Sequence, residues 1–304
     1  MKAIGIDLGG TKIESQLFDD NWDVAARKRV ATPKDYDGLI VCVADLANWA
    51  RHGSDHQLPI GVSAAGLVNK PSGLAVTANL PATGHPILAD IEAAIGQKVS
   101  LINDCRAFTL SEAVFGAGKR DQRVVGLIIG TGLGAGFALN GTLYQGAAGL
   151  AGEIGHTSVP AAEVLRHSLS LLPCGCGAEG CFEPYLSGPG LERLVAVKTG
   201  MQLSSPEIAA LRGIDPQINA AWAIWINLAG TFLRNVQMNY DPDVVVLGGG
   251  PSLINGLIPE LETAFQARRL GQFGLPRLAL AQGGDASGAR GAAHFATQNG
   301  TLNV

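Results

Sequence analysis

Four side chains that can bind a metal lie close together in the sequence. They are His156, Cys174, Cys176 and Cys181. Three thiols and one imidazole form the Cys3His set of a closed structural zinc site, and the Cys-x-Cys-x4-Cys spacing puts the thiolates on one tight turn. The alternative is a disulfide between two of these cysteines with one thiol left over. The pattern favours a structural Zn²⁺ site.

A glycine turn near the N-terminus has the parts of a phosphate-binding site. Asp7-Leu8-Gly9-Gly10-Thr11-Lys12 lies between two expected strands, Ala3–Leu8 and Lys12–Phe18. The glycines offer backbone N–H groups at close range, Thr11 a hydroxyl, Lys12 a positive charge and Asp7 a carboxylate able to hold Mg²⁺. The spacing is not that of a Walker loop, and an ordinary hairpin is the alternative.

The same motif recurs later in the chain, which favours the phosphate interpretation. Ile4–Gly9 aligns with Val125–Gly130, and Gly10-Thr11 aligns with Thr131-Gly132. A third glycine turn, Gly248–Gly250, follows an expected strand. Two halves that each begin with strand, glycine turn and strand predict a duplicated α/β architecture.

Carboxylates stand near both the predicted metal site and a predicted helix start. Asn103 and Asp104 follow an expected strand at 99–102 and head a helix, where Asp104 is either a plain cap or a general base. Glu153 and Glu183 flank the zinc set and would be fixed by it. Composition alone does not decide between these roles.

Length and composition exclude several classes of protein. The 304 residues are 47% hydrophobic and only 16% charged, which excludes intrinsic disorder and leans toward two domains. A net charge of −4 lacks the basic footprint of a nucleic-acid or membrane-surface binder. No apolar run is long enough for a membrane span or an N-terminal signal peptide, so a cytoplasmic protein is expected.

The remaining periodicity predicts elements and boundaries. Helices are expected at about 36–51 and 217–238, the latter with Trp222 and Trp225 in the core, and a last helix is expected after Gly291. We predict an N-terminal lobe at 1–118, joined by a C-terminal helix at about 281–304. The second lobe, with the zinc site, would cover 119–280.

Taken together, these motifs resemble the ROK family of sugar kinases and related repressors, which has the two-lobed actin/hexokinase/Hsp70-like ATPase fold. The resemblance spans nearly the whole chain and rests on an ordered series of motifs: Asp7–Lys12, Asn103-Asp104, Gly130–Gly134, Gly152–His156, Cys174–Glu183 and Gly248–Gly250.

The resemblance implies roles for these residues. Asp7 would serve Mg²⁺, His156 would bind zinc and also face the sugar, and Asp104 would be the base that receives the proton of the attacking hydroxyl. The implied ATP-binding residues are Gly9, Gly10, Thr11, Lys12, Gly130, Thr131, Gly132, Gly248, Gly249 and Gly250. The implied sugar-binding residues are Asn79, Asn103, Asp104, Glu153, His156 and Glu183.

The segment Asn79–Pro86 resembles bacterial N-acetyl-D-glucosamine kinases, which implies ATP-dependent phosphorylation of the 6-hydroxyl of that sugar. N-acetylmannosamine, glucose and fructose are the alternative acceptors. Two segments depart from the family pattern near the expected sugar: Cys105-Arg106 replaces alanine and asparagine, and Ser63–Gly66 lacks a proline.

Two other functions of the family are weighed against catalysis. A repressor would carry an N-terminal helix-turn-helix, yet the phosphate hairpin begins at Ala3. A sugar sensor without activity would be expected to lose Asp7, Lys12 or Asp104, and all three are present. The expected partners are ATP and a small sugar rather than nucleic acid or membrane. A homodimer is the assembly considered, and the sequence does not fix the oligomeric state.

Overall fold

The computed structural model describes residues 1–52 and 58–299, and the chain divides into two compact units. The first unit comprises Met1–Lys119, Gly141–Ala151 and the C-terminal segment from Gln282, and the second comprises Arg120–Asn140 and Gly152–Ala281. The segment Gly141–Ala151, expected in the second lobe, therefore groups with the first unit.

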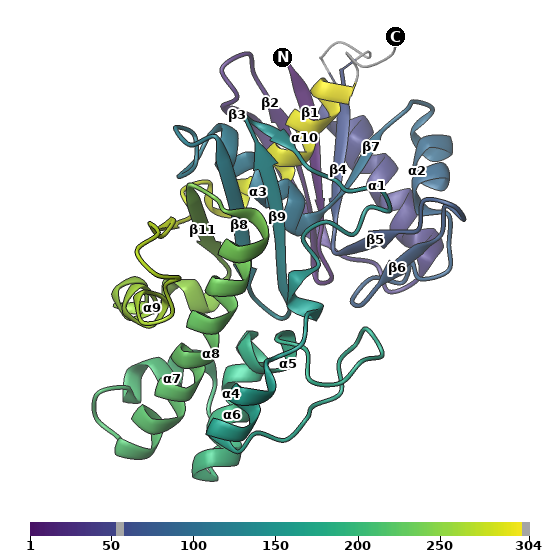
Figure 1. The fold of residues 1–304 in the computed structure, drawn as a ribbon. Coiled ribbons are helices and arrows are strands. Elements are labelled where there is room, and N and C mark those ends of the chain that lie inside the picture. The colour runs from purple at the N-terminus through teal and green to yellow at the C-terminus, as the bar shows by residue number, and fades with distance from the viewer. Residues whose placement is uncertain (53–57, 300–304) are drawn as a thin grey trace. The chain divides into compact units, whose positions relative to one another are not determined.

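The first unit is built on a sheet in the order β3-β2-β1-β4-β7 (Figure 1). Strands β1, β2 and β3 form an antiparallel meander, whereas β4 and β7 run parallel to β1. The elements of this unit are β1 (Ala3–Leu8), β2 (Lys12–Phe18), β3 (Val24–Ala31), α1 (Tyr36–Arg51), β4 (Ile60–Ala64), β5 (Gly66–Val68), β6 (Ala75–Thr77), α2 (Ile87–Ile95), β7 (Ser100–Asn103), α3 (Asp104–Val114), β10 (Thr142–Leu143) and α10 (Ser287–Asn299).

The second unit repeats this plan, with neighbouring strands in the order β9-β8-β11-β12. Strands β8 and β9 are antiparallel, and β11 and β12 run parallel to β8. Its elements are β8 (Arg123–Ile129), β9 (Leu133–Leu139), α4 (Ala161–His167), α5 (Glu183–Leu186), α6 (Gly188–Thr199), α7 (Ser205–Leu211), α8 (Pro216–Tyr240), β11 (Val244–Gly248), α9 (Leu257–Gln266) and β12 (Arg277–Leu280). The predicted duplicated α/β architecture is confirmed.

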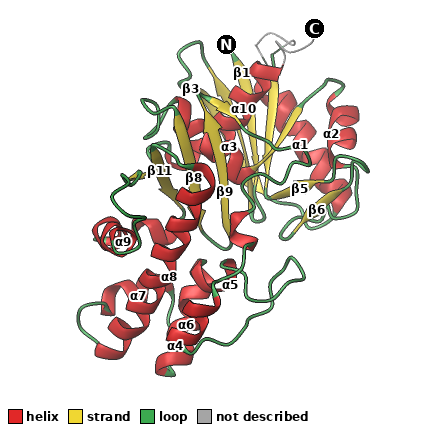
Figure 2. Ribbon diagram, in the orientation of Figure 1, coloured by secondary structure: helices red, strands yellow, loops and turns green. Residues whose placement is uncertain are grey.

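The long helix α8 follows from its sequence. Asp215 caps it by accepting from the N–H groups of Gln217 and Ile218, and a proline occupies the first turn, where its missing N–H costs nothing. Trp222 and Trp225 are buried, as predicted. Figure 2 shows α6, α7 and α8 as neighbouring helices of this unit.

Helix α10 lies against β1 and α3 within the first unit. It begins at Ser287, so the prediction that it starts after Gly291 is wrong. The reason is tertiary: a Cβ on Gly291 would lie 1.8 Å from the carbonyl oxygen of Ala107 on α3. Gly291 is thus required inside the helix for close packing, and the intrinsic cost of glycine there is overridden.

Each unit has its own apolar core. In the first unit the core centres on β1, β4 and α1, and in the second it centres on β8, β11 and α8. Within the described residues, no helix has both the length and the apolar character needed to cross a membrane.

Candidate active site and zinc-binding cluster

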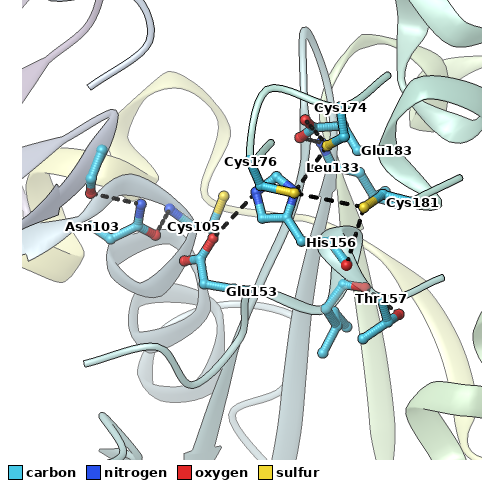
Figure 3. A network of polar contacts seen from close by, with 12 residues as sticks. Asn103, Cys105, Leu133, Glu153, His156, Thr157, Cys174, Cys176, Cys181 and Glu183 are labelled. Carbon is cyan, nitrogen blue, oxygen red and sulfur yellow. Dashed lines mark hydrogen bonds and ion pairs between the residues drawn. The ribbon is translucent and has the colours of Figure 1, made fainter. Parts of the chain in front are cut away.

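The four predicted zinc ligands come together in the second unit (Figure 3). Their ligand atoms all lie within 4.8 Å of one another. His156 Nδ1 is 3.3 Å from Cys174 Sγ, and Cys176 Sγ is 3.7 Å from Cys181 Sγ. Tetrahedral coordination with Zn–S bonds of about 2.3 Å puts two sulfurs about 3.8 Å apart, so the residues fit Zn²⁺. All five cysteines are free thiols, and the disulfide alternative is not adopted.

Short-range backbone hydrogen bonds shape this cluster. The Cys174 N–H donates to the Ala178 carbonyl over 2.8 Å, which closes the turn that carries Cys176. Gly177 and Gly180 have φ values of +89° and +73°, a region that favours glycine. The glycines between the cysteines are therefore needed for the backbone turn itself as well as for placing the metal ligands.

The thiols of the cluster differ in acidity. Burial raises the pKa of the Cys174 thiol and raises that of Cys181 to about 12. A backbone hydrogen bond with Ala178 lowers the pKa of the Cys176 thiol. Because metals bind the thiolate, a zinc ion at this site would displace protons from the two buried thiols.

The two flanking glutamates have different neighbours. Glu153 Oε2 lies 3.9 Å from Nε2 of His156, the ring nitrogen on the other side from the cysteines. Glu183 Oε2 accepts from the N–H of Leu133 over 2.9 Å, and its Oε1 is 4.0 Å from Cys174 Sγ. Glu183 thus connects the zinc cluster to the turn between β8 and β9.

That turn contains the second glycine motif, Gly130–Gly132. The Gly188 N–H donates to the Gly130 carbonyl over 2.8 Å. A Cβ on Gly249 would lie only 1.9 Å from the carbonyl oxygen of Ile129, and Gly249 has a φ of +86°. The structure therefore brings Gly130–Gly132 and Gly248–Gly250 together at the carboxyl ends of β8 and β11, the edge of a parallel sheet where ligands bind in many α/β proteins.

The first glycine motif forms the matching turn of the first unit. The Gly9 N–H donates to the Lys12 carbonyl over 3.1 Å. Asp7, on the strand before the turn, accepts a hydrogen bond from the Ser63 hydroxyl, and burial raises the pKa of its carboxyl. A Cβ on Gly288 would lie 2.7 Å from Asp7 Oδ1, so the first turn of α10 passes directly beside this carboxylate.

Asn79 lies beside the first glycine turn. A Cβ on Gly10 would be 2.8 Å from the Cβ of Asn79 and 2.9 Å from its carbonyl oxygen. The predicted sugar residue and the predicted phosphate turn are therefore in contact within the first unit.

Asn103, rather than Asp104, caps helix α3. Its Oδ1 accepts from the N–H groups of Cys105 and Arg106, and its Nδ2 donates to the Gly66 carbonyl over 3.1 Å and to Asp104 Oδ1 over 3.0 Å. Asp104 is the first residue of the helix. Asn103 therefore provides the N-cap, and Asp104 Oδ1 adds a further hydrogen bond by accepting from the Cys105 N–H over 2.9 Å.

A cavity of about 560 Å³ opens beside Asn103 within the first unit. The β5–β6 hairpin, α2 and the segment after β10 surround it. Its lining is largely apolar and includes Leu67, Val68, Ile87, Leu101 and Leu143. Its polar members are Lys70, Ser72, Thr77, Glu92, Asn103, Arg106 and Gln145.

Three residues of this region were not predicted as functional. Ser63 bonds Asp7, Gly288 makes room for Asp7, and Arg106 binds carbonyl oxygens of the segment after β10. The signal for Arg106 was that Cys105-Arg106 departs from the family pattern, and the signal for Ser63 was that its segment, Ser63–Gly66, lacks the proline of that pattern. For Gly288 the signal was the glycine-rich stretch before the last helix.

The sequence pattern of the ROK family matches residues 3–299. The chain belongs to the ROK family. It is 38% identical to an N-acetylgalactosamine kinase of Shewanella sp. (strain ANA-3), over 95% of this chain and 94% of the relative. It is 36% identical to an N-acetyl-D-glucosamine kinase of Haemophilus influenzae (strain 86-028NP), over 95% and 97% of the two chains.

Solved structures agree with this ROK assignment. A ROK hexokinase from Thermus thermophilus superposes with a TM-score of 0.88 at 30% identity and 99% coverage of both chains. A ROK family glucokinase from Streptomyces griseus, solved with glucose and AMPPNP, gives a TM-score of 0.78 at 28% identity, covering 97% and 99% of the two chains. The fold is the actin-like ATPase fold expected from the sequence.

Proposed function

We propose that this ROK protein transfers the γ-phosphate of ATP to the 6-hydroxyl of N-acetyl-D-glucosamine. The chain is an ATP-dependent sugar kinase of the ROK family, and the proposal concerns its acceptor sugar and the position phosphorylated. The observation that carries it is 36% identity, over nearly the full length of both chains, to a kinase named for this sugar.

We assign the role of general base to Asp104. It lies at the carboxyl end of β7, next to Asn103, whose amide donates to its Oδ1 over 3.0 Å. A carboxylate there accepts the proton of the attacking hydroxyl as its oxygen bonds to the γ-phosphorus and the bond from that phosphorus to the bridging oxygen of ATP breaks, releasing ADP. Asn79, Asn103, Glu153, His156 and Glu183 are the proposed sugar ligands.

For ATP, we propose that the two glycine turns bind phosphate oxygens through backbone N–H groups, with Lys12 adding positive charge. Gly248–Gly250, which packs against the second turn, is assigned to the adenosine. Asp7 is the residue that would hold Mg²⁺. When bound, that ion neutralises phosphate charge during transfer.

The cavity beside Asn103 supports an N-acetylated acceptor. Its apolar lining offers the methyl end of an acetamido group a place out of water, and Gln145 adds a polar group able to bond an amide. A 2-hydroxyl would leave this space unfilled. N-acetyl-D-galactosamine is the second candidate, because the Shewanella relative is named for that sugar.

We further propose that the protein works in the cytoplasm with one structural Zn²⁺ per chain. The reasons are its use of ATP and its cluster of free thiols with an imidazole, which needs a reducing compartment to bind metal.

A panel of sugars tests the acceptor. ADP release would be measured with N-acetyl-D-glucosamine, N-acetyl-D-galactosamine, N-acetylmannosamine, glucose and fructose, and the phosphorylated carbon would be identified by NMR. We expect the highest kcat/KM for N-acetyl-D-glucosamine and a 6-phosphate product. A kcat/KM for glucose about tenfold above that of N-acetyl-D-glucosamine would overturn the assignment, and the same margin for N-acetyl-D-galactosamine would replace it with the second candidate.

A further inference from the structure

Arg106 is a buried cation that binds backbone carbonyl oxygens. Its side chain is 7% exposed. Nε donates to the carbonyl of Ala151 over 3.0 Å, and Nη2 donates to the carbonyl of Gly149 over 2.5 Å. Burying a guanidinium is costly unless hydrogen bonds replace its water, so these bonds fix both partners firmly.

The segment that Arg106 holds is the chain after β10, residues 145–151, here called the 145–151 loop. Gly146 and Gly149 have φ values of +71° and +77°, which few other residues tolerate. Glycine also has more conformational freedom than other residues, so these two positions do not fix the backbone of the loop by themselves. Lys70 adds a second, exposed tether to the carbonyls of Gly146 and Ala147, at 3.4 and 3.2 Å. The shape of the loop therefore depends on cations from outside it.

The same loop forms one wall of the cavity beside Asn103. Gln145 and Gly149 line the cavity, and Arg106 lines it too. Arg106 thus both touches the cavity and holds its glycine-rich wall in place, as the exposed Lys70 also does.

We propose that Arg106 is a positioning residue that sets the preference for an N-acetylated sugar by holding the 145–151 loop as the wall of the acetamido pocket. This inference rests on the proposed function. A sugar with an acetamido group at carbon 2 gains binding energy from the wall, whereas a 2-hydroxyl does not reach it. Loosening the wall therefore weakens binding of the N-acetylated sugar and leaves binding of the sugar with a 2-hydroxyl unchanged.

Arg106→Met is the main test variant, because methionine keeps much of the buried stem and removes every donor. We expect its KM for N-acetyl-D-glucosamine to rise about tenfold, which corresponds to about 1.4 kcal/mol, with kcat within about threefold. The KM values for glucose and for ATP should stay within about twofold. The reason is that the 2-hydroxyl of glucose does not reach the wall, and ATP is assigned to the glycine turns. Hydrogen exchange at 145–151 should become faster.

Arg51→Met is the matched control. Arg51 also tethers backbone in the first unit, donating to the Ile95 carbonyl over 3.3 Å and to Gln97 over 2.6 Å, and it lies outside the lining of the cavity. It should leave both sugar KM values and the exchange of the loop unchanged. Arg106→Lys keeps the charge but not the two-pronged geometry, and should fall between wild type and Arg106→Met.

The outcomes separate this inference from the proposed function. A wild-type enzyme that prefers glucose overturns both. A wild-type enzyme that prefers N-acetyl-D-glucosamine, with an unchanged ratio of sugar KM values in Arg106→Met or unchanged exchange at 145–151, overturns only the role of Arg106. If Arg106→Met does not fold, the same comparison is made with Arg106→Lys, whose unchanged KM ratio and exchange would equally overturn it.

Discussion

At the scale of single residues, Asp104 follows the N-cap residue Asn103 at the start of α3. Asn103 accepts from the N–H groups of Cys105 and Arg106, and Asp104 Oδ1 also accepts from Cys105 N–H. Asp104→Asn keeps a side-chain acceptor oxygen, so it should cost little stability. We expect Asp104→Asn to lower kcat by about 10²–10⁴-fold, because an amide cannot accept the proton, while sugar affinity changes little.

Steady-state kinetics, sugar binding and thermal unfolding of this variant provide the check. Asn103→Ala is the companion variant, since loss of the cap should reduce stability by about 0.5–2 kcal/mol. A kcat of Asp104→Asn within about threefold of wild type would rule out Asp104 as the base, because that lies far below the general-base range.

Glu183 has a second task beside its proposed contact with the sugar. Its carboxylate holds the Leu133 N–H, directly after Gly130–Gly132. Glu183→Ala leaves that N–H without its acceptor, and we expect the KM for ATP to rise by about tenfold, as for loss of a hydrogen bond to a charged group. Glu183→Gln keeps an acceptor oxygen and should raise the KM for ATP much less. Equal ATP KM values in wild type and Glu183→Ala would contradict this role.

At the scale of elements, glycines let α10 approach the sheet of the first unit. A Cβ on Gly61 of β4 would lie 1.8 Å from the Ala292 carbonyl oxygen, and one on Gly5 of β1 would lie 2.0 Å from that of Ala289. Backbone atoms cannot move aside as a flexible side chain can. Close contact between α10 and two strands therefore depends on these two positions.

Gly61→Ala should lower the free energy of unfolding by about 1–3 kcal/mol or more, as overpacking in a tight core does. Denaturant unfolding monitored by circular dichroism gives the value. Gly274→Ala is the control, because a Cβ there meets no atom within 4 Å, and its effect should stay within about 0.5 kcal/mol. Equal stabilities of the two variants would show that the contact with α10 is relaxed in solution.

At the scale of the whole molecule, the Cys3His cluster proposed to bind zinc belongs to the second unit and adjoins its core. Phe182 and Tyr185 follow the last cysteine and pack in that core. The Tyr185 hydroxyl donates to the Ser170 carbonyl over 2.7 Å and accepts from the Leu172 N–H over 3.2 Å, which holds the chain leading into Cys174. Loss of the metal should therefore loosen the second unit first.

Chelation, or Cys181→Ser, should lower Tm by about 5 °C or more, since structural zinc contributes folding energy directly. Hydrogen exchange should rise at 156–186, while β1 and β4 of the first unit keep their protection. Protein purified without chelator should contain about one zinc per chain. Absence of zinc from such protein would refute the assignment of the cluster.

The sequence by itself determined the features that depend on neighbouring residues. The spacing of the cysteines, the two glycine turns and the strands beside them are local patterns. In the structure the four Cys3His residues come together, and the strands lie on either side of each glycine turn. The repeated motif also predicted the duplicated sheets, because a turn between two strands needs no distant contact. The ROK resemblance followed from the order of these motifs along the chain.

Only the tertiary structure decided the roles that distant residues share. Arg106 reaches carbonyls 43 and 45 positions away, and Glu183 reaches an N–H 50 positions away, so no local pattern announces either contact. The start of α10 was predicted wrongly for the same reason: Gly288 and Gly291 look like helix breakers until Asp7 and α3 are seen to need the space. Propensity acts through the residue itself, whereas packing acts through whatever the fold brings beside it, and packing is the larger energy.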